Sequence, residues 1–290
     1  MEFALSNVEF KPADQANNGL RPGESTMVSR SSYAALVLGA CALLMPLGVG
    51  ALTVNFDGLE HGRLVNTQYS VSHGLTISAV NTGGGPDLAV AFDTELTGTR
   101  DSDLEDPWSG GNLPINTNLG NILIIQENNV GTDDGIADRP DDEGSRPAGS
   151  IFLEFSGALD YFGFDLIDVE GPSEYGNDRG YYATFFQNGS VVNQIGFGDL
   201  INPSSSYYQS GVEFGNNYIN RINPIIGGEN GIGVFDSVEV NFGGSAGIDN
   251  LVFGYTPPST PNDPVPEPAT LSLLGMGLAG MVLRNRKRRA

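Results

Sequence analysis

The chain has 290 residues, of which 35 are acidic and 14 are basic, so its formal net charge is −21. An acidic protein repels phosphate, and we therefore expect no nucleic-acid partner. One cysteine cannot form an intrachain disulfide, and Gly and Pro, about a fifth of the residues, disfavour a helix bundle.

The N-terminal region is predicted to be an export signal rather than part of the fold. Residues 27–51 begin with a short segment carrying Arg30, continue with an apolar run over 34–49 and end in small residues. This order is typical of a secretory signal peptide, which signal peptidase is expected to cut between Ala51 and Leu52. Residues 1–26 are polar and acidic, which favours a mis-called start at Met27; the alternative is an unusual leader.

A second interpretation of the signal peptide concerns the only cysteine, Cys41. Residues 38–41 (L-G-A-C) resemble a lipobox, but the apolar run continues beyond Cys41, whereas a lipoprotein usually becomes polar there. A cut after Ala51 would remove Cys41, and the mature chain would then have no thiolate chemistry. No organic cofactor is expected.

Residues 52–255 are predicted to form an all-β domain. Short apolar or alternating segments are separated by Gly, Asn, Asp and Pro, as expected for half-buried strands joined by turns. The predicted strands are 52–56, 75–80, 88–92, 122–126, 151–155, 161–167, 181–186, 191–197, 234–242 and 248–253. We expect an antiparallel β-sandwich, jelly-roll-like in topology.

Two long acidic loops, 93–120 and 128–149, interrupt the strands and flank the apolar segment 121–127. Carboxylate oxygens suit calcium, which takes 6–8 oxygen ligands, although no EF-hand spacing is present. Equally, such loops can be solvated surface that keeps a protein soluble. The candidate calcium ligands are Asp93, Asp101, Asp103, Glu127, Asp141, Asp142 and Glu143.

Other side chains give weaker indications of chemistry. Glu154, Asp165 and Glu239 lie in predicted strands, where they either line a cleft as a catalytic carboxylate pair or form the polar face of a sheet. The two histidines lack a metalloprotease spacing, and no G-x-S-x-G elbow is present. Trp108 is a candidate for stacking on a sugar ring, although most aromatic side chains of a sandwich simply pack.

The C-terminal region has two parts. Residues 256–264 form a Pro-rich linker. Residues 265–290 contain Pro266, Glu267 and Pro268, then an uncharged apolar run over 269–283 that is expected to be a short transmembrane helix. A basic end follows, which is typical of a segment retained on the cytoplasmic side of a membrane; its charged residues are Arg284, Arg286, Lys287, Arg288 and Arg289.

This Pro-Glu-Pro segment, apolar run and Arg-rich end resemble the PEP-CTERM sorting signal of Gram-negative bacteria. The resemblance implies processing by exosortase, a membrane-embedded cysteine protease, in an organism that makes extracellular polysaccharide. The body also resembles a recurrent domain of such proteins in the order Phe92-Asp93-Thr94, 120–127 and 140–143. No established activity comes with that second resemblance.

We therefore expect a secreted, exosortase-sorted matrix or surface protein that is not an enzyme, needs calcium to order its loops and binds polysaccharide. The precursor would be anchored in the inner membrane by its C-terminal helix until it is processed. The alternative is an extracellular enzyme that acts on polysaccharide through a carboxylate pair.

Overall fold

A computed structural model describes residues 51–172, 182–227 and 231–255. These residues form strands with a few short helical turns, which confirms an all-β sandwich. No helix among them has the length and apolar composition needed to cross a bilayer. The predicted leader, the signal peptide up to residue 50, the linker and the sorting segment lie outside the described residues.

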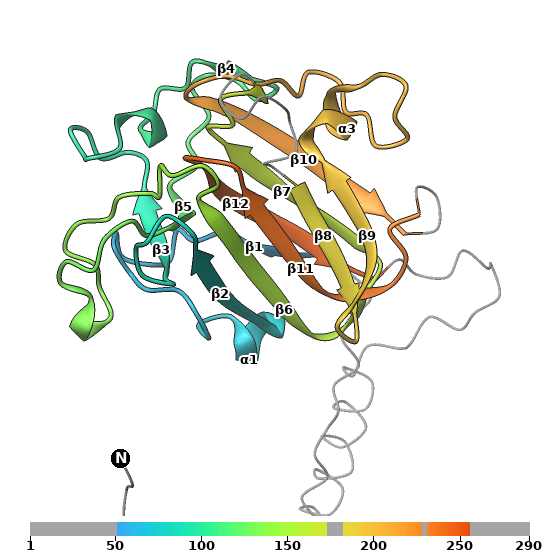
Figure 1. Cartoon of the computed structure of the whole chain (residues 1–290), viewed down its shortest axis with the longest axis horizontal. Coiled ribbons are helices and arrows are strands. Elements are labelled where there is room, and N and C mark those ends of the chain that lie inside the picture. Colours follow the sequence, from blue (N-terminus) through green and yellow to red (C-terminus); the bar gives the residue numbers. More distant parts are fainter. Residues whose placement is uncertain (1–50, 173–181, 228–230, 256–290) are drawn as a thin grey trace, which may run out of the picture. The chain divides into compact units, whose positions relative to one another are not determined.

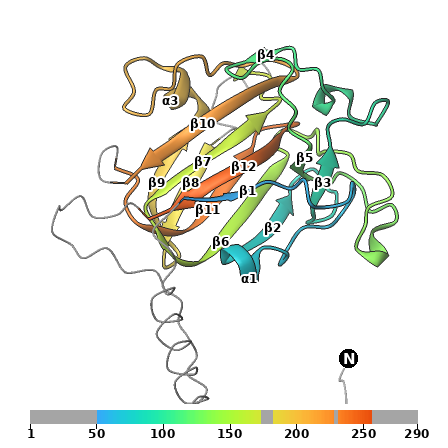
Figure 2. The ribbon, with the colours of Figure 1, turned by 180° about the vertical axis from the view of Figure 1, so that it is seen from behind.

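The strands form two sheets, which Figures 1 and 2 show from opposite sides. The seven-stranded sheet has the order β3-β5-β12-β7-β10-β4, with β1 also pairing with β12. Its strands are β1 (Leu52–Val54), β3 (Ala89–Asp93), β4 (Gly110–Gly111), β5 (Asn121–Ile125), β7 (Tyr161–Ile167), β10 (Tyr218–Ile226) and β12 (Gly247–Gly254). Its described strand pairs are antiparallel apart from β10 and β4.

The five-stranded sheet has the order β2-β6-β11-β8-β9 and is antiparallel throughout. Its strands are β2 (Leu75–Asn81), β6 (Gly149–Leu159), β8 (Tyr182–Gln187), β9 (Ser190–Gly196) and β11 (Phe235–Phe242). The helical turns are α1 (Ser70–His73), η1 (Ser102–Leu104), η2 (Thr132–Asp134) and α3 (Phe197–Ile201).

The main hydrophobic core lies between the two sheets. Alternate residues of β2, such as Leu75 and Ile77, point into it and are buried, as the period of a strand requires. Phenylalanines from both sheets meet at its centre, where the rings of Phe155 and Phe253 have centroids 4.7 Å apart. The main core is therefore formed by the inward-facing residues of both sheets.

Each of the ten predicted strands overlaps a strand of the structure, but β10 was missed. This strand contains Pro224 and a register shift between Ile222 and Ile225. The shift places the two inward-facing isoleucines three residues apart, so the alternation that identifies a strand is broken. The two-residue strand β4 is made only of glycine, which gives no strand signal.

A second hydrophobic core covers the outer face of the seven-stranded sheet. All four apolar residues of β3 are buried, and so is all of β5, so both faces of these strands need cover. The 93–120 loop supplies it: Leu104, Trp108 and Leu119 pack with Phe92 and Ile122 in one cluster. The 93–120 loop therefore covers the outer face of the seven-stranded sheet and contributes to the folded core.

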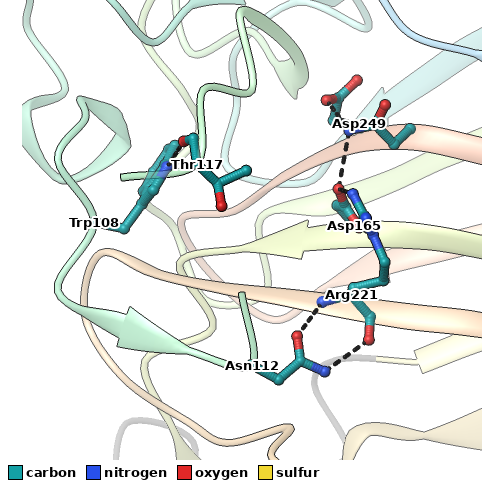
Figure 3. Close-up of polar contacts among 7 residues, drawn as sticks. Trp108, Asn112, Thr117, Asp165, Arg221 and Asp249 are labelled. Carbon is teal, nitrogen blue, oxygen red and sulfur yellow. Dashed lines mark hydrogen bonds and ion pairs between the residues drawn. The ribbon is translucent and has the colours of Figure 1, made fainter. Parts of the chain in front are cut away.

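The hypothesis that Trp108 stacks on a sugar is wrong for this conformation. Its side chain is only 2% exposed, and its Nε1–H donates to the carbonyl oxygen of Thr117 at 2.8 Å (Figure 3). Because the ring fills the second core and its polar group is already bonded, it presents no face to a ligand.

Beside the second core, a polar row crosses the same sheet face (Figure 3). The guanidinium of Arg221 binds both carboxylate oxygens of Asp165, at 2.8 and 2.7 Å. Asn250 donates to Asp165 and Asp249. Asp165 is fully buried whereas Arg221 reaches the surface, so Asp165 is a charge-paired structural group that no substrate can reach.

Trp108 should contribute strongly to stability because it fills the second core. We expect Trp108→Ala to lower the free energy of unfolding by about 3–5 kcal/mol, measured by urea denaturation. Ile115→Ala, an exposed position in the same loop, serves as the control and should change it by less than about 0.5 kcal/mol. Equal effects of both substitutions would contradict the second core.

Arg221 should be needed to hold the buried charge of Asp165. We expect Arg221→Met to cost about 2–4 kcal/mol, and Asp165→Asn in the same chain to recover part of that loss, since no charge then remains unpaired. Arg63→Met, which breaks the exposed pair with Glu60, should cost at most about 1 kcal/mol. If the double variant were less stable than Arg221→Met alone, the proposed origin of the loss would be wrong.

Candidate metal centre

Five carboxylates from three separate segments meet where the 93–120 loop crosses the end of the seven-stranded sheet. We call this group the acid cluster, and its members are Asp101, Asp103, Asp142, Asp168 and Glu170. Asp101 directly precedes the turn η1, and Asp103 lies within it. Asp142 lies in the segment between η2 and β6, and Asp168 and Glu170 directly follow β7. The cluster is a product of the fold because its members lie up to 69 residues apart.

Its centre consists of Asp103, Asp168 and Glu170, each of which offers a carboxylate oxygen within 4.8 Å of the others. Calcium binds oxygen at 2.3–2.6 Å, so two oxygens on one ion lie no more than about 5 Å apart. The spacing of these three groups therefore fits a single calcium ion. Because the donors are all carboxylate oxygens, they suit a hard cation better than zinc.

Asp168 is the most constrained member of the cluster. It lies directly after β7 with a positive φ of 60°, and it is fully buried. Its Oδ1 accepts the N–H of Asn217, and its Oδ2 accepts the hydroxyl of Ser245 at 3.0 Å. These bonds fix the carboxylate and leave its remaining lone pairs for a cation.

Asp101 and Asp142 adjoin this centre as a hydrogen-bonded pair. Both are nearly buried, and the backbone N–H of Asp142 donates to Oδ2 of Asp101 at 2.9 Å. Asp142 in turn accepts the N–H of Ala246 at 2.8 Å. The pair therefore links the 93–120 loop to the segment after β5 and to the turn before β12.

Within the acid cluster, the ionised forms of the aspartates are disfavoured. Burial raises the pKa of Asp101 and that of Asp168 to about 8, with repulsion from neighbouring carboxylates adding to both. Burial likewise raises the pKa of Asp103 and that of Asp142 to about 6. A bound divalent cation would stabilise all four charged forms.

The cluster contains one cationic contact among the described residues. Arg146 binds Oε2 of Glu170 at 2.9 Å, and Asn216 donates to its Oε1. This pair is on the exposed side of the cluster, so it offsets the charge of Glu170 more than that of the buried aspartates. The residues present therefore fit a calcium ion.

Three predicted ligands, Asp101, Asp103 and Asp142, lie in the cluster, whereas Asp168 and Glu170 were missed. The only signal for them was Asp168-Val169-Glu170, an acid-apolar-acid order directly after a strand. Alternation across a strand end places such acids on one side. Nothing in the sequence indicated that this strand end meets the 93–120 loop.

Asp93, another predicted calcium ligand, does not belong to the acid cluster. It lines an open polar hollow of about 400 Å³ together with His61, Asp57 and Glu95. The N–H of Asp93 donates to Nδ1 of His61 at 3.0 Å, so the proton of the neutral imidazole lies on Nε2. Burial lowers the pKa of His61, which keeps the ring neutral in this tautomer, and Nε2 is then no metal ligand.

Glu127, Asp141 and Glu143 form a separate group at the end of β5. Burial raises the pKa of Glu127, and repulsion from Asp141 adds to the shift. Glu143 has a structural contact, since its Oε2 accepts from Asn81 at 2.8 Å. The seven predicted calcium ligands are thus divided among three places, and only one of these contains three carboxylates within reach of one ion in the described residues.

The predicted signal-peptidase site borders the folded domain. Leu52 is the first residue of β1 and pairs with Phe253, while Ala51 is exposed. A cut between them would leave every strand intact. The other predicted processing and membrane residues, Pro266 to Pro268 and Arg284 to Arg289, lie outside the described residues.

Comparison with known proteins gives one finding. Residues 264–288 match the family model of the PEP-CTERM protein-sorting motif. No curated protein and no solved structure matches the chain. The motif indicates export, exosortase processing and a final location at the cell surface or outside the cell, and it identifies the chain as a PEP-CTERM protein.

Proposed function

We propose that this protein is a non-catalytic component of the extracellular matrix or cell surface that binds polysaccharide and is stabilised by calcium. The observation that carries the proposal is the acid cluster. Its three central carboxylates lie within 4.8 Å of one another, and two of its aspartates have pKa values raised to about 8. Such a cluster is costly for an acidic protein unless a cation offsets it.

Calcium bound at the acid cluster would hold the 93–120 loop against the seven-stranded sheet. Asp101 and Asp103 belong to this loop, whereas Asp168 and Glu170 follow β7 and Asp142 follows β5. An ion bound among them would join the loop to the sheet that its Leu104 and Trp108 already cover. Asp103, Asp168 and Glu170 would hold the ion, and Asp101 and Asp142 would orient the loop beside it.

For the precursor, we propose anchoring in the inner membrane by the apolar run 269–283, with Arg284 to Arg289 retained in the cytoplasm. The uncharged run and the five basic residues after it support this orientation. Signal peptidase and exosortase are then the partners during export.

An enzyme that acts on polysaccharide is the second candidate, and one observation favours it. Glu154 and Asp236 line the same open hollow of about 590 Å³ at one end of the five-stranded sheet. Release of reducing sugar from the host's own polysaccharide, abolished by Glu154→Gln, would favour the enzyme. Binding without release of sugar would favour the matrix protein.

Calcium should raise the melting temperature of the protein. At about 100 times the dissociation constant, calcium stabilises the native state by about 2.7 kcal/mol, which corresponds to about 5–10 °C for a domain of this size. Asp168→Asn and Asp103→Asn should lose most of this shift. Differential scanning calorimetry in calcium and in excess chelator measures it.

Asp93→Asn is the matched control because Asp93 was a predicted ligand but lies in a different hollow. It should retain the full calcium shift. No shift in the unmodified protein would reject calcium binding, and a full shift in both Asp168→Asn and Asp103→Asn would reject the acid cluster as its site.

The Pro-Glu-Pro segment should be required for processing. We expect Glu267→Ala combined with Pro266→Ala to accumulate uncut precursor in the envelope fraction, detected by mass spectrometry of culture fluid and envelope. Pro261→Ala, in the linker, should be processed normally. Release of the double variant at the normal mass would contradict the assignment of these residues.

A further inference from the structure

The loop that follows α3 forms an open hollow together with part of β10. The hollow measures about 320 Å³, which is at the lower end of the range of ligand pockets, about 300–1,000 Å³. We call it the tyrosine hollow, and its lining residues are Ser206, Tyr207, Tyr208, Gln209, Ser210, Asn223, Pro224 and Ile225. Its size suits a small ligand or a short segment of a polymer.

An irregularity in β10 provides the place where the loop attaches. The register of β10 against β7 shifts between Ile222 and Ile225, so Asn223 and Pro224 have no partner in β7. The backbone N–H of Asn223 donates to Oε1 of Gln209 at 2.7 Å, and the backbone carbonyl of Asn223 accepts from Nε2 of Gln209 at 3.0 Å. The side-chain amide of Gln209 thus acts like a neighbouring strand and holds the loop beside β10 (Figure 1).

Two further contacts fix the loop. The backbone N–H of Gln209 donates to the carbonyl oxygen of Leu200 in α3 at 2.8 Å. The hydroxyl of Tyr207 accepts from Nδ2 of Asn193 in β9 at 2.7 Å, and Tyr207 packs against the main core. Because these contacts form the hollow without a ligand, less conformational freedom is lost when a ligand binds.

Tyr208 presents an aromatic ring that the fold does not use. In contrast to Tyr207, it is 42% exposed and belongs to neither of the two hydrophobic cores of the described residues. It also differs from Trp108, whose ring is buried. A tyrosine offers a large, rigid contact surface with an apolar face and a polar edge, and covering the apolar face removes it from water, which is favourable.

The polar groups around Tyr208 are uncharged. Ser206, Ser210 and Asn223 are exposed and supply two hydroxyl groups and an amide, which both donate and accept hydrogen bonds. Residues 200–212 include no charged side chain, although the whole chain has 35 acidic residues. The hollow therefore suits a neutral ligand that carries hydroxyl groups, and it offers no ion pair to a charged ligand.

The size and chemistry of the tyrosine hollow indicate a sugar rather than a protein partner. A protein interface takes about 20–30 residues on each side, whereas eight residues line this hollow. A sugar ring has an apolar C–H face, which packs on an aromatic ring, and a rim of hydroxyl groups, which donate and accept hydrogen bonds. Tyr208 and the uncharged side chains beside it offer a partner for each of these surfaces.

We propose that the tyrosine hollow binds a neutral glycan, with a sugar ring stacked on Tyr208 and its hydroxyl groups bonded to Ser206, Ser210 and Asn223. This inference rests on the proposed polysaccharide-binding function and gives it a location and a ligand class. The acid cluster contributes no residue to the hollow, so calcium binding and glycan binding can be tested independently.

The test is affinity gel electrophoresis of the full chain in mild detergent. The gels contain pullulan, galactomannan or xyloglucan as neutral probes, the host's own polysaccharide, or alginate as an anionic probe. We expect retardation by at least one neutral probe and none by alginate. Tyr208→Ala should weaken the apparent affinity at least tenfold, whereas Tyr208→Phe, which keeps the ring, should weaken it less than threefold.

Tyr255→Ala is the matched control because Tyr255 is 54% exposed and directly follows β12, outside the hollow. This variant should bind like the unmodified protein. Since Tyr208 lies outside both hydrophobic cores, Tyr208→Ala should fold normally. Its melting temperature, expected within about 2 °C of that of the unmodified protein, checks this.

The outcomes separate this inference from the proposed function. Retardation that survives Tyr208→Ala, or that Tyr255→Ala reduces equally, would overturn the site but leave polysaccharide binding standing. Retardation by alginate that Tyr208→Ala removes would overturn the ligand class. Failure of the unmodified chain to bind any probe or the host's polysaccharide would overturn both the inference and the proposed polysaccharide binding.

Discussion

The outer face of the seven-stranded sheet is apolar and has to be covered, and several other features of the fold follow from this requirement. The strands β3 and β5 are apolar on both faces, so one face packs in the main core and the other would contact water. Burial of an apolar side chain is worth about 1.5–3 kcal/mol, which makes exposure of this face costly. The 93–120 loop covers it with Leu104, Trp108 and Leu119, and this requirement fixes where the loop runs.

The position of the acid cluster follows from that cover. With Leu104 buried in the second core, its neighbours Asp101 and Asp103 are carried to the end of β7, next to Asp168 and Glu170. Burial and mutual repulsion then raise their pKa values. The same packing that stabilises the sheet therefore brings carboxylates together where their negative charge is unfavourable. In our proposal, a bound calcium ion offsets this charge.

The two sheets have different surfaces because only one of them is covered. The seven-stranded sheet has its outer face beneath a loop, with buried polar pairs such as Arg221 and Asp165 beside the apolar cluster. The five-stranded sheet carries polar residues such as Glu154 and Glu239 on its outer face, where alternation along β6 and β11 places them.

The sorting motif, the all-β class and ten of the strands could be predicted from the sequence, because each depends on local composition or on the two-residue period of a strand. The signal peptide stays a prediction. The sequence did not reveal β10, whose bulge breaks that period. Three of seven predicted ligands reached the acid cluster, while Trp108 proved to be a core residue. Which acids meet is decided by contacts between segments far apart in the chain, such as Asp103 with Asp168, and such contacts arise only when the apolar faces pack.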